Sequence, residues 1–313
     1  MQKPLLKVLY IAGFGRSGST ILGNILNEID GFFHVGELCY LVQKGLIDNK
    51  MCGCGVAFQE CTTWNYILDK AFGGVDQMNS QEILKFYEKA PKNREIICKL
   101  LLNQEISLDN QNKDYLRFLK KLYFALHSVR GSKVIVDSSK LPWYGYLLGK
   151  IPNIELYILH LIRDSRSTGY SWRRKKVRID TKENKNELME RTEIITSSCQ
   201  WNSANLAIEL IAKSLKKPYL QIKYEDFIES PQEVTETVLN FIQEKNNEDS
   251  LNFDNGQVNL GANHTIWGNP NRIQTGPIKL SLDNEWQTNM KLSDKILATI
   301  LTLPWLIKHG YII

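Results

Sequence analysis

Residues 6–28 read LKVLYIAGFGRSGSTILGNILNE, and this stretch decides the fold of the chain. Its opening run, VLYI at 8–11, is apolar and uncharged, which is typical of a strand buried on both faces of a parallel sheet. Glycine-rich residues 13–20 follow, and apolar residues then recur at helical spacing as far as Ile29. The stretch therefore predicts a strand, a glycine-rich turn and a helix whose first free amides form an anion site.

The turn itself carries groups that suit a phosphate. Glycines let the backbone approach a ligand closely, and Arg16 adds a positive charge. Ser17, Ser19 and Thr20 add hydroxyl donors. We therefore predict that these residues, together with Gly18, cradle a phosphate group.

The P-loop pattern GxxxxGK[ST] fits this turn only in part. Gly13 and Gly18 have its spacing and Thr20 has its last position, but Ser19 stands where the pattern has lysine. That lysine serves the β- and γ-phosphates of a nucleoside triphosphate. An ordinary ATPase or kinase is therefore disfavoured. An atypical P-loop phosphotransferase and a non-catalytic nucleotide-binding protein remain alternatives.

Length and composition limit the class of protein. The 313 residues, 43% hydrophobic and 23% charged, suit one globular α/β domain. The net charge of +5 agrees with an anionic ligand, and the chain has no arginine-rich tail that would indicate nucleic-acid binding. No apolar run has the length of a membrane span and no signal peptide precedes the first strand, so we expect a cytoplasmic protein.

Strands and helices alternate along the rest of the chain. Further strands are predicted at 133–136, 156–162 and 219–223, each followed by a helix. This order implies an α/β fold with a parallel sheet, right-handed crossovers and flanking helices. Ligands bind such sheets at the carboxyl ends of the strands. The chemically active residues expected at or near that edge are Arg16, Glu37, Asp137, Lys140, Arg163 and Tyr224.

Between these strands lie segments with other patterns. Residues 39–130 are predicted to form a helical, cysteine-containing insertion, entered by a short link at 31–38. The polar stretch 177–187 is interpreted as a mobile loop. Residues 246–282 are rich in Asn, Gly and Pro and are expected to be irregular, and a last pair of helices is expected from residue 283.

Three of the six cysteines cluster in CGCGVAFQEC, at 52, 54 and 61. A metal site usually needs four ligands, so this cluster lacks one unless Cys39 or a histidine supplies it. We favour a turn with reduced thiols, because disulfides are rare in a cytosolic chain.

A second motif, LHLIRDSRSTGYSWRRK at residues 159–175, runs from a predicted strand into a predicted helix and places Arg163 eight residues before Ser171. Together, this motif and the glycine-rich turn resemble the sulfotransferase family that uses 3′-phosphoadenosine 5′-phosphosulfate (PAPS). The similarity is strongest to the branch that contains tyrosylprotein sulfotransferases and their bacterial relatives. It implies a P-loop-like sulfotransferase fold, a single domain over residues 1–313, PAPS as donor and 3′-phosphoadenosine 5′-phosphate (PAP) as product.

The resemblance also implies roles for individual residues. The glycine-rich turn would bind the 5′-phosphosulfate, and Arg163 with Ser171 would bind the 3′-phosphate. Tyr224, in KYEDF, would contact the nucleotide. Arg272, in HTIWGNPNR, is a second candidate for the 3′-phosphate.

Transfer to a hydroxyl or amine acceptor further needs a group that takes the acceptor's proton. Glu37 is the expected base, because Gly36 allows close approach and its position resembles the catalytic glutamate of the tyrosylprotein branch. His34 is the substitute. Arg16 and Lys140 are expected to neutralise developing charge, so no metal is required. The class of acceptor and the oligomeric state stay open.

Overall fold

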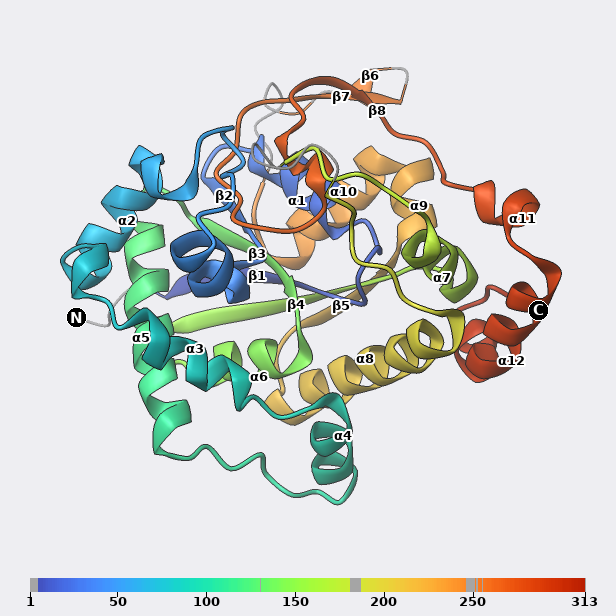
Figure 1. Cartoon of the computed structure of the whole chain (residues 1–313), viewed down its shortest axis with the longest axis horizontal. Helices are drawn as coiled ribbons and strands as arrows, with labels where there is room; N and C mark the ends of the chain where they lie inside the picture. The colour runs from blue at the N-terminus through green and yellow to red at the C-terminus, as the bar shows by residue number, and fades with distance from the viewer. Residues whose placement is uncertain are drawn as a thin grey trace.

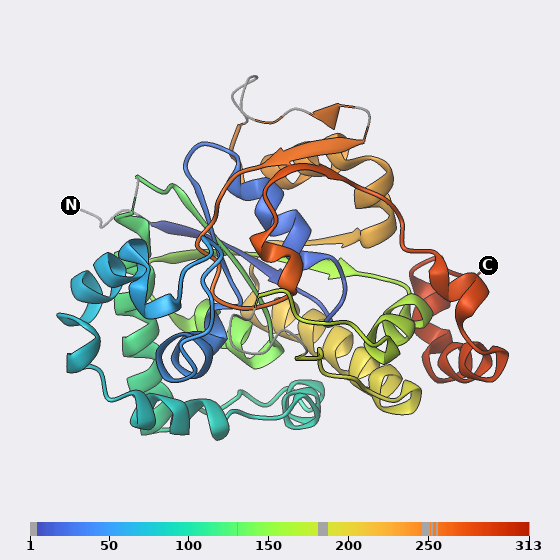
Figure 2. The ribbon, with the colours of Figure 1, turned by 45° about the horizontal axis from the view of Figure 1, so that its top comes forward.

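The architecture is a parallel sheet between two layers of helices (Figures 1 and 2). A computed structural model describes residues 5–129, 131–180, 187–245, 251, 253–254 and 256–312. Five parallel strands form the sheet in the order β2-β3-β1-β4-β5. They are β1 Leu6–Ala12, β2 Phe32–Gly36, β3 Val134–Lys140, β4 Ile154–Ile162 and β5 Tyr219–Lys223. The predicted α/β sheet with flanking helices is confirmed.

The central strand β1 shows how the sequence builds two cores. Leu6, Val8 and Tyr10 enter the cluster on one face of the sheet, whereas Leu9 and Ile11 enter the cluster on the other. This alternation follows from the two-residue period of a strand. Because both faces are covered, the strand reads as an almost continuous apolar run.

The first core lies under the insertion between β2 and β3. Its helices are α2 Thr62–Phe72, α3 Ser80–Glu88, α4 Asn93–Leu101 and α5 Asn110–His127. Four short helical segments accompany them: η1 Leu38–Tyr40, η2 Leu41–Ile47, η3 Phe58–Glu60 and η4 Val75–Gln77. Helices α6 (Pro142–Lys150) and α8 (Ile194–Leu215) extend this layer. The predicted helical character of the insertion is confirmed, whereas the single-domain organisation stays a prediction.

The second core lies under α1 (Ser19–Asn27) and the segments α9 (Tyr224–Glu229) and α10 (Pro231–Phe241). Helix α7 spans Ser165–Arg173 after β4. The C-terminal helices are α11 Glu285–Asn289 and α12 Leu292–Lys308, at the end of the molecule opposite α2 and α3 in both ribbon views.

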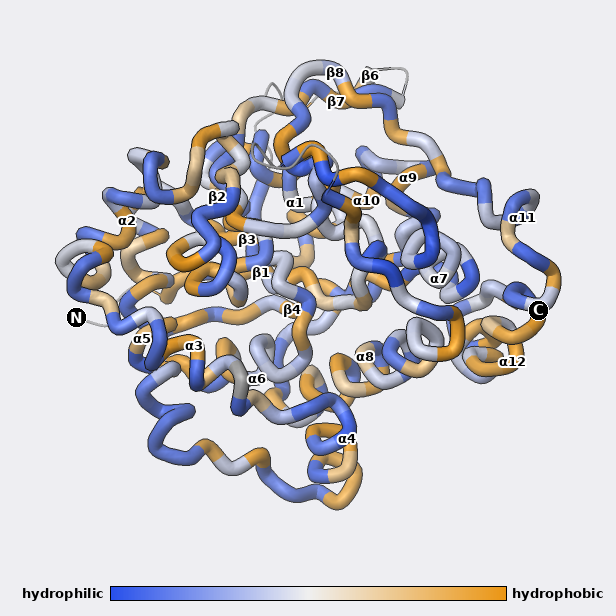
Figure 3. The backbone as a smooth tube through the Cα atoms, in the orientation of Figure 1, coloured by the Kyte–Doolittle hydropathy of each residue, from blue (hydrophilic) through white to orange (hydrophobic). Residues whose placement is uncertain are grey.

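Helix α12 packs one side against the rest of the protein and leaves the other side exposed. Ala298, Thr302 and Leu306 are buried, but Ile296 and Ile300 are half or more exposed. Figure 3 shows hydrophobic residues recurring along this helix. Across the described part of the chain, no helix combines the length and apolarity needed to cross a membrane.

Two segments form strands where the sequence predicted none. The expected link at 31–38 contains the edge strand β2, which pairs with β3. All five residues of β2, FFHVG, are buried. The expected irregular region contains a three-stranded sheet of β6 Phe253–Asp254, β7 Gln257–Leu260 and β8 Gly276–Lys279. The long helix α8 begins at Ile194, after the segment 187–193. Within the predicted loop at 177–187, residues 181–186 lie outside the described residues.

Candidate active site

A cavity of about 930 Å³ opens at the carboxyl ends of the strands. It brings together nine of the residues singled out from the sequence: Arg16, Gly18, Ser19, Thr20, Glu37, Lys140, Arg163, Ser171 and Tyr224. Four others are buried and do not line it: Ser17, His34, Asp137 and Arg272. These nine residues therefore share one cavity at the sheet edge that the strand-end rule indicates, and their roles stay predictions.

The glycine-rich turn has a backbone that only certain residues tolerate. Gly18 caps α1 with φ of 91°, in the left-handed region. A Cβ added there would lie 2.4 Å from Cδ2 of Tyr224, so glycine is needed for this approach. No side chain caps α1 and no acidic residue occupies its first turn. The first-turn amides of α1 are therefore suited to an anion.

Arg16 is a partly buried cation in this turn. Its guanidinium lies 4.6 Å from the ring centre of Trp172, and Nη1 lies 3.2 Å from Sδ of Met189. Burial lowers the pKa of Arg16 to about 10, while the charge of Glu37 acts in the opposite direction. Arg16 therefore keeps its positive charge at neutral pH.

Arg163 follows β4 and reaches back to the turn. Its Nη1 donates to the carbonyl of Arg16 at 3.0 Å, and its guanidinium stacks 4.4 Å from the ring centre of Tyr224. Nη2 lies 3.5 Å from a carboxylate oxygen of Asp283. Ser171 lines the same cavity from α7. The spacing of eight residues in the sequence thus places an arginine and a hydroxyl at one cavity.

Several polar atoms around the turn are buried without a hydrogen-bond partner among the described residues. They are Nε of Arg16, Oγ of Ser17, and Nε and Nη2 of Arg163. An unsatisfied buried donor costs about 1–3 kcal/mol, so native proteins rarely keep several together without a ligand. All four atoms can donate hydrogen bonds, and two of the three residues are cations, so the group fits an anionic ligand.

Glu37 and Lys140 form an ion pair on the other side of the cavity. Nζ of Lys140 lies 2.5 Å from Oε1 of Glu37, and both side chains are largely buried. Lys140 also donates to the carbonyl of Ser138 at 2.9 Å. A Cβ built on Gly268 would lie 3.2 Å from Oε1 of Glu37 and 3.5 Å from Oγ1 of Thr20. The Glu37 carboxylate and the Thr20 hydroxyl therefore both lie beside Gly268.

His34 is poorly placed as the alternative base. It is fully buried and does not line the cavity. Its Nδ1 lies 3.1 Å from Oδ1 of Asn24, and its Nε2 lies 3.0 Å from Oγ of Ser138. Burial, with a smaller effect of the Lys140 charge, lowers its pKa to about 3. These contacts make His34 a structural residue between α1 and β3.

Acidification is therefore expected to destabilise the wild type more than His34→Gln. The unfolded histidine has an ordinary pKa of 6.5, so the unfolded chain takes up this proton first as the pH falls. The stabilisation of the fold by the neutral His34 side chain is therefore complete above pH 6.5 and is lost as the pH falls toward 3. The wild type minus variant difference in unfolding free energy should fall by about 1.4 kcal/mol per pH unit below pH ~5.5. Urea unfolding of both proteins measures it, and a pH-independent difference would contradict the buried neutral imidazole.

Arg272 has contacts that fix it inside the protein. Its Nη1 donates to the carbonyl of Thr265 at 2.9 Å, and its Nη2 donates to the carbonyl of Met51 at 2.5 Å. Nη2 also pairs with Asp180 at 3.2 Å, and both side chains are fully buried. The structure therefore does not bring Arg272 to the cavity with Arg163.

The segment after α7 brings basic residues to the cavity that were not singled out from the sequence. Arg174, Lys176 and Arg178 line it beside Arg16. Arg174 pairs with Asp283 at 2.7 Å, and Arg178 stacks 3.9 Å from the ring centre of Trp267. Burial, then the charge of Arg16, lowers the pKa of Lys176. The dense basic run RRKKVR was the available signal.

Solved structures similar to this chain include sulfotransferases. The sulfotransferase domain of the olefin synthase from Synechococcus PCC 7002 is 18% identical, with a TM-score of 0.50 over 96% of each chain. A sulfotransferase from Mycobacterium avium is 13% identical, with a TM-score of 0.46, and the match covers 98% of this chain and 77% of that one. Retinol dehydratase, solved with androsterone and inactive cofactor PAP, is 14% identical, with a TM-score of 0.35 and coverage of 96% and 80%.

A search of curated proteins found no match. At 18% identity, the similarity to the olefin synthase domain supports the fold alone. The model of a family described as the sulfotransferase family, however, matches residues 9–248, which is most of the chain. The chain therefore belongs to the sulfotransferase family.

Proposed function

We propose that this protein transfers a sulfuryl group from PAPS to a hydroxyl or amine acceptor. The single observation that carries the proposal is the set of buried donors on Arg16, Ser17 and Arg163 that make no hydrogen bond with the described residues, beside a helix N-terminus. Membership of the sulfotransferase family and the resemblance of both motifs to PAPS-binding segments support the same donor.

The two ends of the donor would be held by different elements. The turn of Arg16, Gly18 and Ser19 would bind the 5′-phosphosulfate through amides, hydroxyls and charge. Arg163 and Ser171 would bind the 3′-phosphate. Tyr224 lies between the two phosphate sites, since its ring contacts the Gly18 position and stacks on Arg163. The ring would pack against the nucleotide.

Glu37 would act as the general base. The acceptor oxygen or nitrogen attacks sulfur in line. Its bond to sulfur forms as the bond between sulfur and the 5′-phosphate oxygen breaks, and PAP leaves. The acceptor's proton passes to Glu37, whose Oε1 is held by Lys140. Lys140 and Arg16 would stabilise the charge that develops on the leaving oxygen, so the transfer step needs no metal ion.

Transfer from donor labelled in the sulfuryl group to an acceptor library would test this function. We expect labelled product with at least one hydroxyl or amine acceptor class and its loss in Glu37→Gln. Magnesium-dependent turnover of ATP without sulfuryl transfer would instead support a phosphotransferase. Binding of PAP with no transfer to any acceptor would favour a non-catalytic nucleotide-binding protein.

A further inference from the structure

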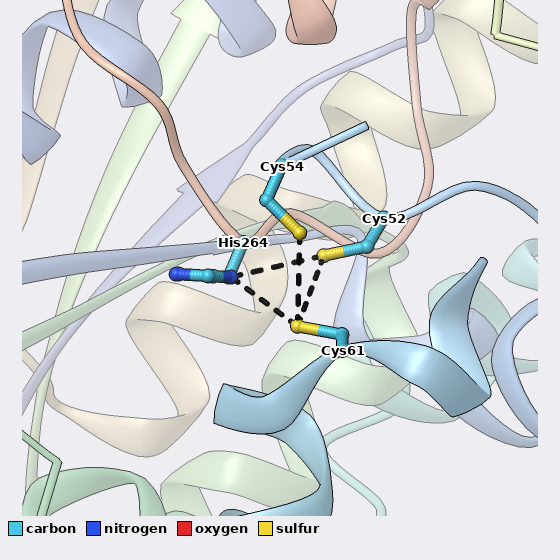
Figure 4. A group of neighbouring side chains, drawn as sticks. All are labelled: Cys52, Cys54, Cys61 and His264. Carbon is cyan, nitrogen blue, oxygen red and sulfur yellow. Dashed lines mark hydrogen bonds between the residues drawn. The ribbon is translucent and has the colours of Figure 1, made fainter. Parts of the chain in front are cut away.

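A cluster of three cysteines and one histidine lies outside the proposed transfer site (Figure 4). Cys52 and Cys54 lie in the loop before η3, Cys61 lies between η3 and α2, and His264 lies in the segment after β7. Their four ligand atoms all lie within 4.8 Å of one another. The fold thus supplies a fourth ligand that the cysteine spacing alone lacked. Cys39 is not part of the group.

The distances within the cluster match those of a tetrahedral metal site. A zinc ion with Zn–S of about 2.3 Å and Zn–N of about 2.0 Å separates two sulfurs by about 3.8 Å and a sulfur from a nitrogen by about 3.5 Å. Sγ of Cys61 lies 3.7 Å from Sγ of Cys52 and 3.8 Å from Sγ of Cys54. Nδ1 of His264 lies 3.3 Å from Sγ of Cys61 and 3.9 Å from Sγ of Cys52.

The histidine is oriented for a ligand by its neighbours. Nε2 of His264 lies 3.2 Å from Oγ1 of Thr63, and its backbone carbonyl accepts a hydrogen bond from Nε1 of Trp64 at 2.7 Å. With the proton on Nε2 donated to Thr63, Nδ1 keeps its lone pair toward the sulfurs. Metal-ligating histidines are commonly held in this way through their second nitrogen.

We propose that Cys52, Cys54, Cys61 and His264 bind one structural Zn²⁺ ion. Three thiolates and one imidazole in tetrahedral arrangement are a ligand set that zinc prefers. All four positions are filled by protein groups, so no position stays open for water or substrate. Such closed sites stabilise a fold and do not catalyse.

The ion would join the cysteine loop to the wall of the cavity. Gly53 donates its amide to the carbonyl of Thr265 at 2.9 Å, and a Cβ added to Gly53 would lie 1.9 Å from Oδ1 of Asn263. The same wall segment pairs with β2 and with Glu37, through Ile266 N to Val35 O at 3.1 Å and Glu37 N to Trp267 O at 3.3 Å. Zinc would therefore fix the segment against which the proposed base is positioned.

Metal analysis of untagged protein, purified with reductant and without chelator, tests the site directly. We expect about one zinc per chain. Cys61→Ser and His264→Ala should lose most of it. Cys98→Ser and Cys199→Ser are matched controls, because both cysteines are exposed and outside the cluster, and they should keep it.

Two further measurements do not depend on the folding of ligand variants. Wild-type protein refilled with Co²⁺ should give the intense visible absorption of tetrahedral thiolate coordination. Thr63→Ala keeps all four ligands and should bind zinc about 10–100-fold more weakly in competition with a chelating dye.

Several results would overturn the proposal. One is wild-type protein that stays metal-free after dialysis against zinc and gives no tetrahedral cobalt spectrum. A second is a disulfide between two of the three cysteines in freshly purified protein. A third is equal loss of zinc from Cys98→Ser and Cys61→Ser, which would place the metal elsewhere. None of these readouts uses sulfuryl transfer, so the zinc proposal and the proposed function can fail separately.

Discussion

Glu37→Gln is expected to lower the rate of sulfuryl transfer by about 10²–10⁴-fold, the usual cost of losing a general base. Glutamine keeps the size of the side chain and can still accept the hydrogen bond from Lys140, but it cannot take a proton. Affinity for PAP should change little, because the proposed contacts to PAP come from the turn, Arg163 and Ser171. Steady-state kinetics and calorimetry with PAP separate the two effects.

A matched control is available within the same cavity. Glu190 lines it but is exposed and is not the partner of Lys140. Glu190→Gln should therefore keep near-wild-type turnover. Equal losses in both variants would indicate a general electrostatic effect. Full turnover in Glu37→Gln, with loss in His34→Ala, would move the base to His34 despite its burial.

Arg163→Ala is expected to weaken PAP binding by about 2–4 kcal/mol, the range for a buried, charge-assisted contact. Binding of 5′-AMP, which lacks the 3′-phosphate, should be nearly unchanged. Arg163→Lys should recover part of the affinity, because it restores the charge without the forked donors of the guanidinium. Calorimetry with both nucleotides measures the difference.

Arg173→Ala serves as the control for this second change. Arg173 lies on α7 but pairs with Asp294 at 2.6 Å and does not line the cavity. The Arg173→Ala variant should therefore bind PAP with wild-type affinity. Since Arg163 also contacts the carbonyl of Arg16 and the ring of Tyr224, a purely structural role is the competing explanation. Equal losses for PAP and 5′-AMP would support that explanation.

Local patterns were enough to predict the centre of the fold. The apolar run of β1, the glycine-rich turn and the helix after it are consecutive, so their order could be predicted directly from the sequence. The strand-end rule then placed Arg16, Lys140 and Arg163 at one edge, and the structure brings them to one cavity. Their roles in binding and catalysis stay predictions.

Features set by distant contacts were not predictable in this way. The strand β2 is five residues long and buried throughout, so it lacks the alternation that identifies a half-exposed strand. His264 is 203 residues from Cys61, and no spacing rule links them. Arg272 matched a family segment, yet the carbonyl of Thr265 and the carboxylate of Asp180 hold it inside the protein.

The most direct test of the central claim is calorimetric titration of the wild type at low salt with PAP, 5′-AMP and ATP with magnesium. The site described here predicts that PAP binds most tightly, because only PAP carries both a 5′- and a 3′-phosphate for the two cationic positions at Arg16 and Arg163. Binding of ATP without binding of PAP would contradict it.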